Sequence, residues 1–230
     1  MSSKRMLTWA TALGLAVAGP VLGSALLVPT HSAAAADEDE IPLPYNDPML
    51  AYLTDTTADA EVRALEERGY VESSLRTVSL GSRCDVEICF ARTLVMHTFK
   101  TRGVDIRTQS ILAEVTTNAT EVTGVRLVEL VRQPGTEPVF GTSILQAYMQ
   151  ESTVARAIER LRASYREAFL ETFEIAGNCG VAGCSSEVLV VHSFRPLFAP
   201  AATTSIVALV SVEPIRRMVE SVNLVTLADK

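Results

Sequence analysis

Apolar residues recur every three or four positions between residues 154 and 173, and charged residues fill most of the positions between them. This pattern is typical of an amphipathic helix with one buried face. We therefore expect a long helix here, with Ser152 or Thr153 as its N-cap. A weaker stripe of the same kind begins near residue 49 and is interrupted by Gly69, which leaves residues 70–83 open to either helix or strand. The clearer stripe consists of Val154, Ala157, Ile158, Leu161, Tyr165, Ala168, Phe169 and Phe173.

After each of these stretches the hydrophobic period changes to two and β-branched residues become frequent, which predicts strands. Turn residues such as Gly103, Asn118 and Pro200 separate the segments. Short links between neighbouring strands imply antiparallel pairing. The expected strands are 90–101, 104–116 and 121–132, followed later by 188–195, 203–212 and 219–228.

The chain contains an internal repeat. The segment from Cys84 to Lys100 returns at Cys179 to Arg195, with two cysteines, a histidine, a phenylalanine and a final basic residue at matching positions. The matches extend in both directions at offsets of 95 to 97 positions. Repeats at a fixed separation indicate a duplicated structural unit.

These observations predict an α+β fold of two tandem repeats related by pseudo-twofold symmetry. Each repeat is expected to be a long helix against a three- or four-stranded antiparallel meander with its own disulfide. Repeat 1 covers 49–132, a linker covers 133–144, and repeat 2 covers 145–230.

The N-terminal region has the pattern of an export signal. Lys4 and Arg5 precede a long apolar run, and the small residues of 33–36 suit a signal peptidase. We interpret 1–36 as a signal peptide, with an uncleaved membrane anchor as the alternative, and 37–48 as an acidic, proline-rich leader. Contact with a membrane is expected only if the segment is not cleaved.

The chain is acidic, with a formal net charge of −7 at pH 7, and both basic residues of the signal region would be lost on cleavage. It has no basic stretch suited to phosphates, so nucleic acid is not an expected partner. The expected location is the bacterial periplasm or the extracellular space.

The four cysteines are Cys84, Cys89, Cys179 and Cys184. In an oxidising compartment, identically spaced pairs are most simply disulfides. Three connectivities exist for four cysteines, but the repeat favours Cys84 with Cys89 and Cys179 with Cys184, because each unit then closes its own bridge.

His97 and His192 occupy equivalent positions in the two repeats. We favour a half-buried histidine hydrogen-bonded within each sheet, and therefore expect no cofactor. The alternative is a zinc or copper ion shared by both imidazoles at the seam between the repeats. Against it, the spacing from Cys89 to His97 is not that of a zinc finger, and cysteines in disulfides cannot ligate.

Other candidate residues carry weaker signals. Lys100, Arg102 and Arg195 end the histidine strands and are candidates for anion binding, although basic residues at strand ends also protect sheet edges. The matching acids Glu72 and Glu167 are expected to be solvated. The matching tyrosines, Tyr52 and Tyr148, are expected to be packing residues.

The sequence has no nucleophile elbow, no phosphate-binding loop and no His-Glu-x-x-His motif, so no catalytic residue is assigned. The sequence is interpreted as an exported, non-catalytic binding or assembly subunit that contacts another extracytoplasmic protein or itself. The alternative function is a metal-binding or hydrolytic protein that uses His97 and His192 at the interface between the repeats.

Overall fold

The computed structural model describes residues 47–84, 89–133, 143–181, 183–198, 202–213 and 218–230. Each half of the chain contains two short helices followed by four strands. The first half holds α1 (Pro48–Thr54), α2 (Thr56–Glu67), β1 (Tyr70–Cys84), β2 (Cys89–Thr101), β3 (Ile106–Thr117) and β4 (Val122–Arg132). The second half holds α3 (Ile144–Gln150), α4 (Ser152–Arg162), β5 (Tyr165–Gly180), β6 (Gly183–Pro196), β7 (Thr203–Glu213) and β8 (Met218–Asp229).

Acidic or hydroxyl side chains start all four helices. Asp47 caps α1, and Asp55 caps α2 by accepting from the backbone N–H of Ala58 at 2.9 Å. In the second half Ser143 caps α3, and the Glu151 carboxylate accepts from the N–H of Val154 at 2.7 Å. The predicted caps at Ser152 and Thr153 are therefore wrong by one or two residues. In the first half, Asp55 divides the helical stretch that begins near residue 49 into α1 and α2. In the second half, α3 lies before the start of the predicted helix.

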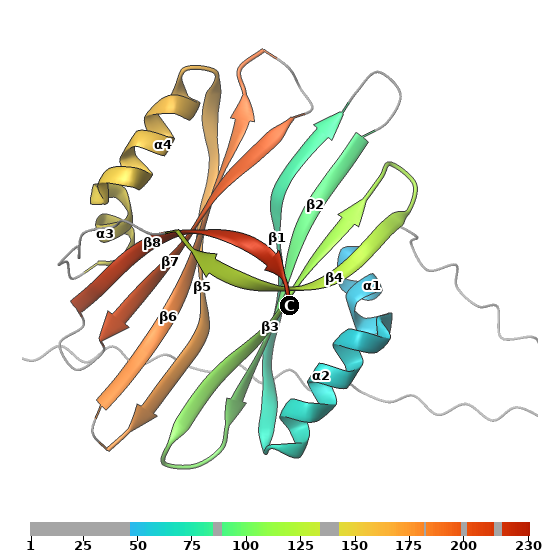
Figure 1. The fold of residues 1–230 in the computed structure, drawn as a ribbon, viewed down its shortest axis with the longest axis vertical. Coiled ribbons are helices and arrows are strands. Elements are labelled where there is room, and N and C mark those ends of the chain that lie inside the picture. The colour runs from blue at the N-terminus through green and yellow to red at the C-terminus, as the bar shows by residue number, and fades with distance from the viewer. Residues whose placement is uncertain (1–46, 85–88, 134–142, 182, 199–201, 214–217) are drawn as a thin grey trace, which may run out of the picture. The chain divides into compact units, whose positions relative to one another are not determined.

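All neighbouring strands pair antiparallel, in the order β1-β2-β3-β4-β8-β7-β6-β5. Pairing of β4 with β8 joins the two halves into one eight-stranded sheet. Two short pairings add further contacts between the halves: Gly81 and Ser82 of β1 pair with β7, and residues 106–109 of β3 pair with β5. The four strands of one half therefore face the four strands of the other (Figure 1).

Three apolar clusters hold these layers together. The central cluster lies between the two halves of the sheet and draws on β1 to β8, for example Met96, Phe173 and Val191. A second cluster lies between α1, α2 and the outer face of the first four strands, and a third lies in the same way under α3 and α4. Figure 1 shows the two helix pairs on the outer faces of their own strands.

The predicted α+β fold, with one long helix against a meander in each repeat, is wrong. The described residues are mostly β, with eight antiparallel strands in one sheet and helices of only 7, 12, 7 and 11 residues. Tyr165, Phe169 and Phe173, which the sequence pattern places on the helix, belong to strand β5. A spacing of four fits one face of a helix, and because four is a multiple of two it also fits one face of a strand.

The strands that follow the cysteines lie where the alternating pattern placed them, within a few residues. The undecided segment 70–83 is strand β1, because α2 ends at Glu67 and Gly69 turns the chain with a φ of +84°. The signal and leader assignments for residues 1–46 lie outside the described residues. Among the helices that the structure describes, none is long and apolar enough to cross a membrane.

Candidate functional site

Both predicted disulfides are present. Cys84 pairs with Cys89 and Cys179 with Cys184, in each case directly across the closed end of a hairpin, β1–β2 or β5–β6. The described part of the chain has no free cysteine. Because these sulfur atoms are bonded to each other, they serve neither as nucleophiles nor as metal ligands.

His97 of β2 lies beneath α1, where it is 3% exposed. Its Nδ1 lies 3.1 Å from the hydroxyl of Tyr52, which is 1% exposed. The Nε2 atom lies 3.5 Å from a carboxylate oxygen of Glu72 on β1 and has no hydrogen-bond partner among the described residues. The ring also packs against Phe99, with centroids 4.2 Å apart.

His192 of β6 repeats this arrangement in the second half. Its Nδ1 lies 3.3 Å from the hydroxyl of Tyr148 on α3, and its Nε2 lies 3.8 Å from a carboxylate oxygen of Glu167 on β5. Phe194 packs on the ring as Phe99 does on His97. Each half thus contains a buried tyrosine–histidine pair with a glutamate at its edge.

Burial determines the protonation of these groups. It lowers the pKa of His97 and of His192 below the usual value, although the neighbouring glutamates oppose the shift. It also raises the pKa of Tyr52 and of Tyr148 far above the usual value for tyrosine. Both histidines are therefore neutral, and both tyrosines protonated, at pH 7.

The structure does not bring the two histidines together. His97 lies with the cluster beneath α1 and α2, and His192 with the cluster beneath α3 and α4, whereas the central cluster fills the space between the halves. Among the described residues, no group of three histidine, cysteine or acidic side chains is close enough to hold a metal ion. The predicted arrangement, in which His97 and His192 meet at the seam between the repeats, is therefore not found.

The three candidate anion-binding residues are also dispersed. Lys100 lies 3.3 Å from the Glu174 carboxylate of β5, so it forms an ion pair between the halves. Arg102 is exposed in the turn after β2, and Arg195 lies at the end of β6, opposite Arg166. Within the described ranges, no contact groups these three side chains into one site.

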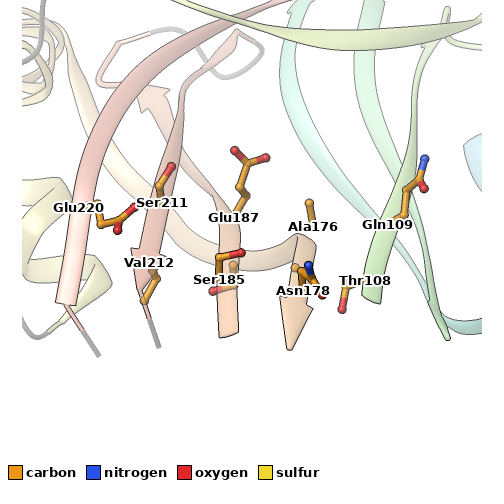
Figure 2. A pocket seen from close by; sticks show the side chains of 11 residues that line it. Thr108, Gln109, Ala176, Asn178, Ser185, Glu187, Ser211, Val212 and Glu220 are labelled. Atoms are coloured by element: carbon orange, nitrogen blue, oxygen red, sulfur yellow. The ribbon is translucent and has the colours of Figure 1, made fainter. Parts of the chain in front are cut away.

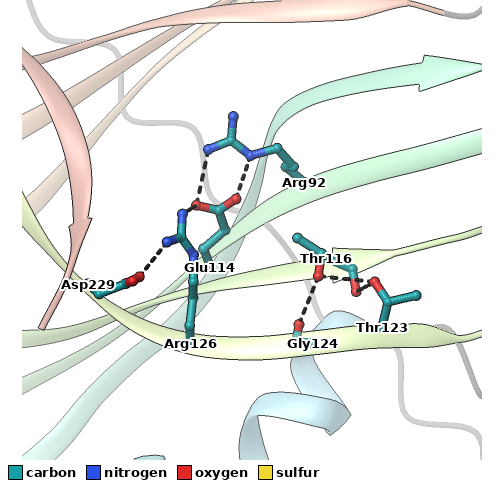
Figure 3. A network of polar contacts seen from close by, with 7 residues as sticks. All are labelled: Arg92, Glu114, Thr116, Thr123, Gly124, Arg126 and Asp229. Carbon is teal, nitrogen blue, oxygen red and sulfur yellow. Dashed lines mark hydrogen bonds and ion pairs between the residues drawn. The ribbon is translucent and has the colours of Figure 1, made fainter.

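A buried carboxylate forms a separate polar network (Figure 3). Glu114 of β3 is 2% exposed and accepts hydrogen bonds from Arg92 and, at 2.8 Å, from Arg126. Arg126 also bonds Asp229 at the end of β8. Burial raises the pKa of Glu114, but the hydrogen bonds and charges of the two arginines outweigh it and hold that pKa below its usual value. The network ties β2, β3, β4 and β8 together.

A groove of about 480 Å³ lies where β3 meets β5, and both halves line it (Figure 2). Its lining comes from β3, β5, β6, β7 and β8. Six polar side chains in this lining make no hydrogen bond or ion pair with any other residue of the described chain. They are Gln109, Asn178, Ser185, Ser186, Ser211 and Glu220.

The equivalent opening, where β1 meets β7, differs. The backbone pairing there, Gly81 with Thr204, lies 95 positions from the pairing of Ala176 with Gln109 in the groove. This opening is smaller, about 220 Å³, and most of its polar side chains have partners within the chain. Ser82 bonds Thr203 at 3.0 Å, and Arg92 is held by Glu114. Of these two equivalent openings, the β3–β5 groove has the larger volume and, among the described residues, more polar side chains without a partner in the chain.

No family model, curated protein or solved structure matches this chain.

The sequence alone indicated neither the tyrosine–histidine pairs nor the groove. The pairs had a signal, because tyrosine, glutamate and histidine all recur in the repeat at nearly the same offset. Tyr52 and Tyr148 are buried as expected, but each also bonds a histidine, and Glu72 and Glu167 each lie beside one. The groove had no such signal, since its residues are ordinary polar residues near strand ends.

Proposed function

We propose that this chain is an exported, non-catalytic binding or assembly subunit that docks onto another extracytoplasmic protein through the β3–β5 groove. The observation that carries the proposal is the set of six polar side chains that face the groove without an internal partner. Hydrogen-bonding groups of this kind, positioned on rigid strands, favour recognition of a partner's polar groups. At the equivalent opening, Ser82, Thr203 and Arg92 instead have hydrogen-bond partners within the chain.

The groove favours a partner segment that carries lysine or arginine. The described residues that line it include two carboxylates, Glu187 and Glu220, and no lysine or arginine. Glu187 already accepts a hydrogen bond from Arg132, whereas Glu220 has no ion-pair partner in the described chain. Complementary charge increases association rates and excludes partners of the same sign.

The non-catalytic part of the proposal rests on the burial of the histidines. A general base must come within hydrogen-bond reach of its substrate. His97 and His192 are 3% and 1% exposed and contact a tyrosine on the side of the helices. Their position favours a structural role.

Export is supported by the disulfides. Such bonds persist in oxidising compartments and are rare in the cytosol, so two of them point to a location outside the cytoplasm. Together with the signal pattern of residues 1–36, they favour a periplasmic or extracellular protein. Mass spectrometry of the N-terminus of the exported protein would test whether cleavage occurs after Ala36.

Charge reversal at Glu220 tests the binding proposal. The wild-type chain, Glu220→Arg and the control Glu129→Arg would be cross-linked in the envelope of the source cell and purified. Glu129 is an exposed glutamate of β4 outside the groove, so both variants change the net charge equally. We expect Glu220→Arg to reduce the yield of a specific cross-linked protein at least tenfold and Glu129→Arg to leave that yield unchanged. Equal recovery with both variants would refute a role for the groove.

A further inference from the structure

The tyrosine–histidine pairs connect each pair of helices to the sheet beneath it. Tyr52 lies on α1, a helix of only seven residues, and His97 lies on β2. Tyr148 and His192 make the same connection between α3 and β6. Each contact is almost fully buried, so water does not replace it when it is lost.

The surroundings of the neutral histidine decide which atom carries its proton. Nε2 of His97 faces the Glu72 carboxylate at 3.5 Å, an arrangement that favours a proton on Nε2. Nδ1 is then an acceptor, and the hydroxyl of Tyr52 donates to it. The opposite tautomer would turn a lone pair toward the carboxylate and leave the buried tyrosine proton without an acceptor.

A second proton on the histidine reverses the hydrogen bond. Nδ1 then carries hydrogen and becomes a donor, so the tyrosine oxygen must accept and its own proton must turn elsewhere. His97 Nδ1 is the only partner of the Tyr52 hydroxyl in the described chain. Protonation therefore leaves a buried hydroxyl proton unpaired, which weakens the attachment of α1.

The charges around the two histidines differ. Two acidic residues face His97, Glu72 of β1 and Glu66 of α2. Asp55 and Glu61 lie near Tyr52, and the apolar Ile111 of β3 lies opposite His97.

His192 is faced by one acidic and one basic residue, Glu167 of β5 and Arg162 of α4, with the apolar Ile206 of β7 opposite. Arg162 bonds Glu167 at 2.7 Å, so it competes with the histidine for that carboxylate and repels a second positive charge. The residue 95 positions before Arg162 is Glu67.

We propose that the two tyrosine–histidine pairs are proton-sensitive latches that hold the helices on the sheet, and that the first, Tyr52–His97, takes up its proton at a higher pH than the second. Mild acid then loosens α1 and α2 while α3 and α4 stay docked. One half of the chain responds to pH and the other maintains the fold. This inference is independent of the proposed binding groove.

Two measurements on the disulfide-intact chain test the latch. NMR titration of the imidazole resonances, assigned with His97→Asn and His192→Asn, gives the order in which the two rings protonate. Hydrogen exchange measured by mass spectrometry between pH 7.5 and 5.0, corrected for the intrinsic rates, reports the docking of residues 48–67 and 144–162. We expect His97 to titrate first, with exchange in 48–67 increasing about tenfold or more while 144–162 changes less.

Two variants make the test specific. Arg162→Gln is a surface change that should raise the pH at which His192 titrates and increase acid-induced exchange in 144–162. Tyr52→Phe removes the hydroxyl proton that acid leaves unpaired, so exchange in 48–67 should become less dependent on pH. The proposal is overturned if His192 titrates first or together with His97. It is equally overturned if His97 becomes protonated while exchange in 48–67 stays constant.

Discussion

Replacement of Glu114 tests how its polar network stabilises the sheet near the pairing of β4 with β8. The position is informative because the residue 95 positions later, Leu209, is part of the central apolar cluster. The first half therefore has a carboxylate bonded to two arginines at the position where the second half has a leucine. We compare Glu114→Gln, which keeps the shape and removes the charge, with Glu114→Leu, which introduces the residue of the second half.

The magnitudes follow from burial. Hydrogen bonds to a charged group contribute roughly 1.5–3 kcal/mol each. Arg92 and Arg126 are 54% and 44% exposed, however, so they regain water when the carboxylate is lost. We therefore expect Glu114→Gln to lower the free energy of unfolding by about 2 kcal/mol, which lowers Tm by roughly 4–8 °C. In Glu114→Leu, burial of the leucine side chain stabilises the fold by roughly 2 kcal/mol, so the free energy of unfolding should stay within about 1 kcal/mol of the wild-type value.

Urea unfolding followed by circular dichroism measures both variants, and an unchanged m-value shows that the change reflects stability. Arg126→Gln serves as a control, because it removes one donor and leaves Arg92 on the carboxylate. Equal destabilisation of Glu114→Leu and Glu114→Gln would contradict this expectation. That result would mean that the site does not accept an apolar side chain and that the ion network itself stabilises the sheet near the β4–β8 pairing.

Three further predictions concern stability. Reduction of both disulfides should lower the free energy of unfolding by about 2 kcal/mol per bridge, given the small rings that they close; an unchanged Tm in reductant would contradict their stabilising role. Because burial lowers the pKa of both histidines, the unfolded chain binds more protons near pH 6, so stability should fall as pH decreases through about 6.5. A double variant, His97→Gln with His192→Gln, should lose that part of the pH dependence in urea titrations. Gly81→Ala should destabilise the β1–β7 contact by roughly 1–3 kcal/mol, because the new Cβ would lie 2.9 Å from the backbone oxygen of Thr203. In Gly124→Ala the close atom is the hydroxyl of Thr116, which can rotate, so the loss measured by thermal unfolding should be smaller.

The sequence predicted the strands that follow the cysteines because alternation and β-branched residues act locally. It predicted the disulfides because two identically spaced pairs leave one simple connectivity. It did not distinguish strand from helix at 165–173, where a spacing of four residues satisfies both periods. Nor did it show that Asp55 ends one helix and starts the next, or that a separate helix precedes Glu151, because an acidic cap looks like any other polar residue until the chain direction changes.

The functional features were harder to predict because they depend on distant pairings. Tyr52 and His97 are 45 residues apart, and only the docking of α1 on β2 brings them together. The groove depends on the short pairing of β3 with β5, which joins the two halves and has no local signature. A repeat indicates which residues correspond, but it does not show how one copy packs against the other.

The proposed binding surface is tested most directly by site-specific photo-cross-linking in the source cell. A photoreactive residue would replace Asn178 in the groove and, in a matched experiment, Arg83, which lies 95 positions earlier at the equivalent opening. We predict that position 178 forms a discrete cross-link to another extracytoplasmic protein, that Glu220→Arg removes the cross-link, and that position 83 forms none. A cross-link of equal yield at both positions, or at position 83 alone, would contradict a binding role for the β3–β5 groove.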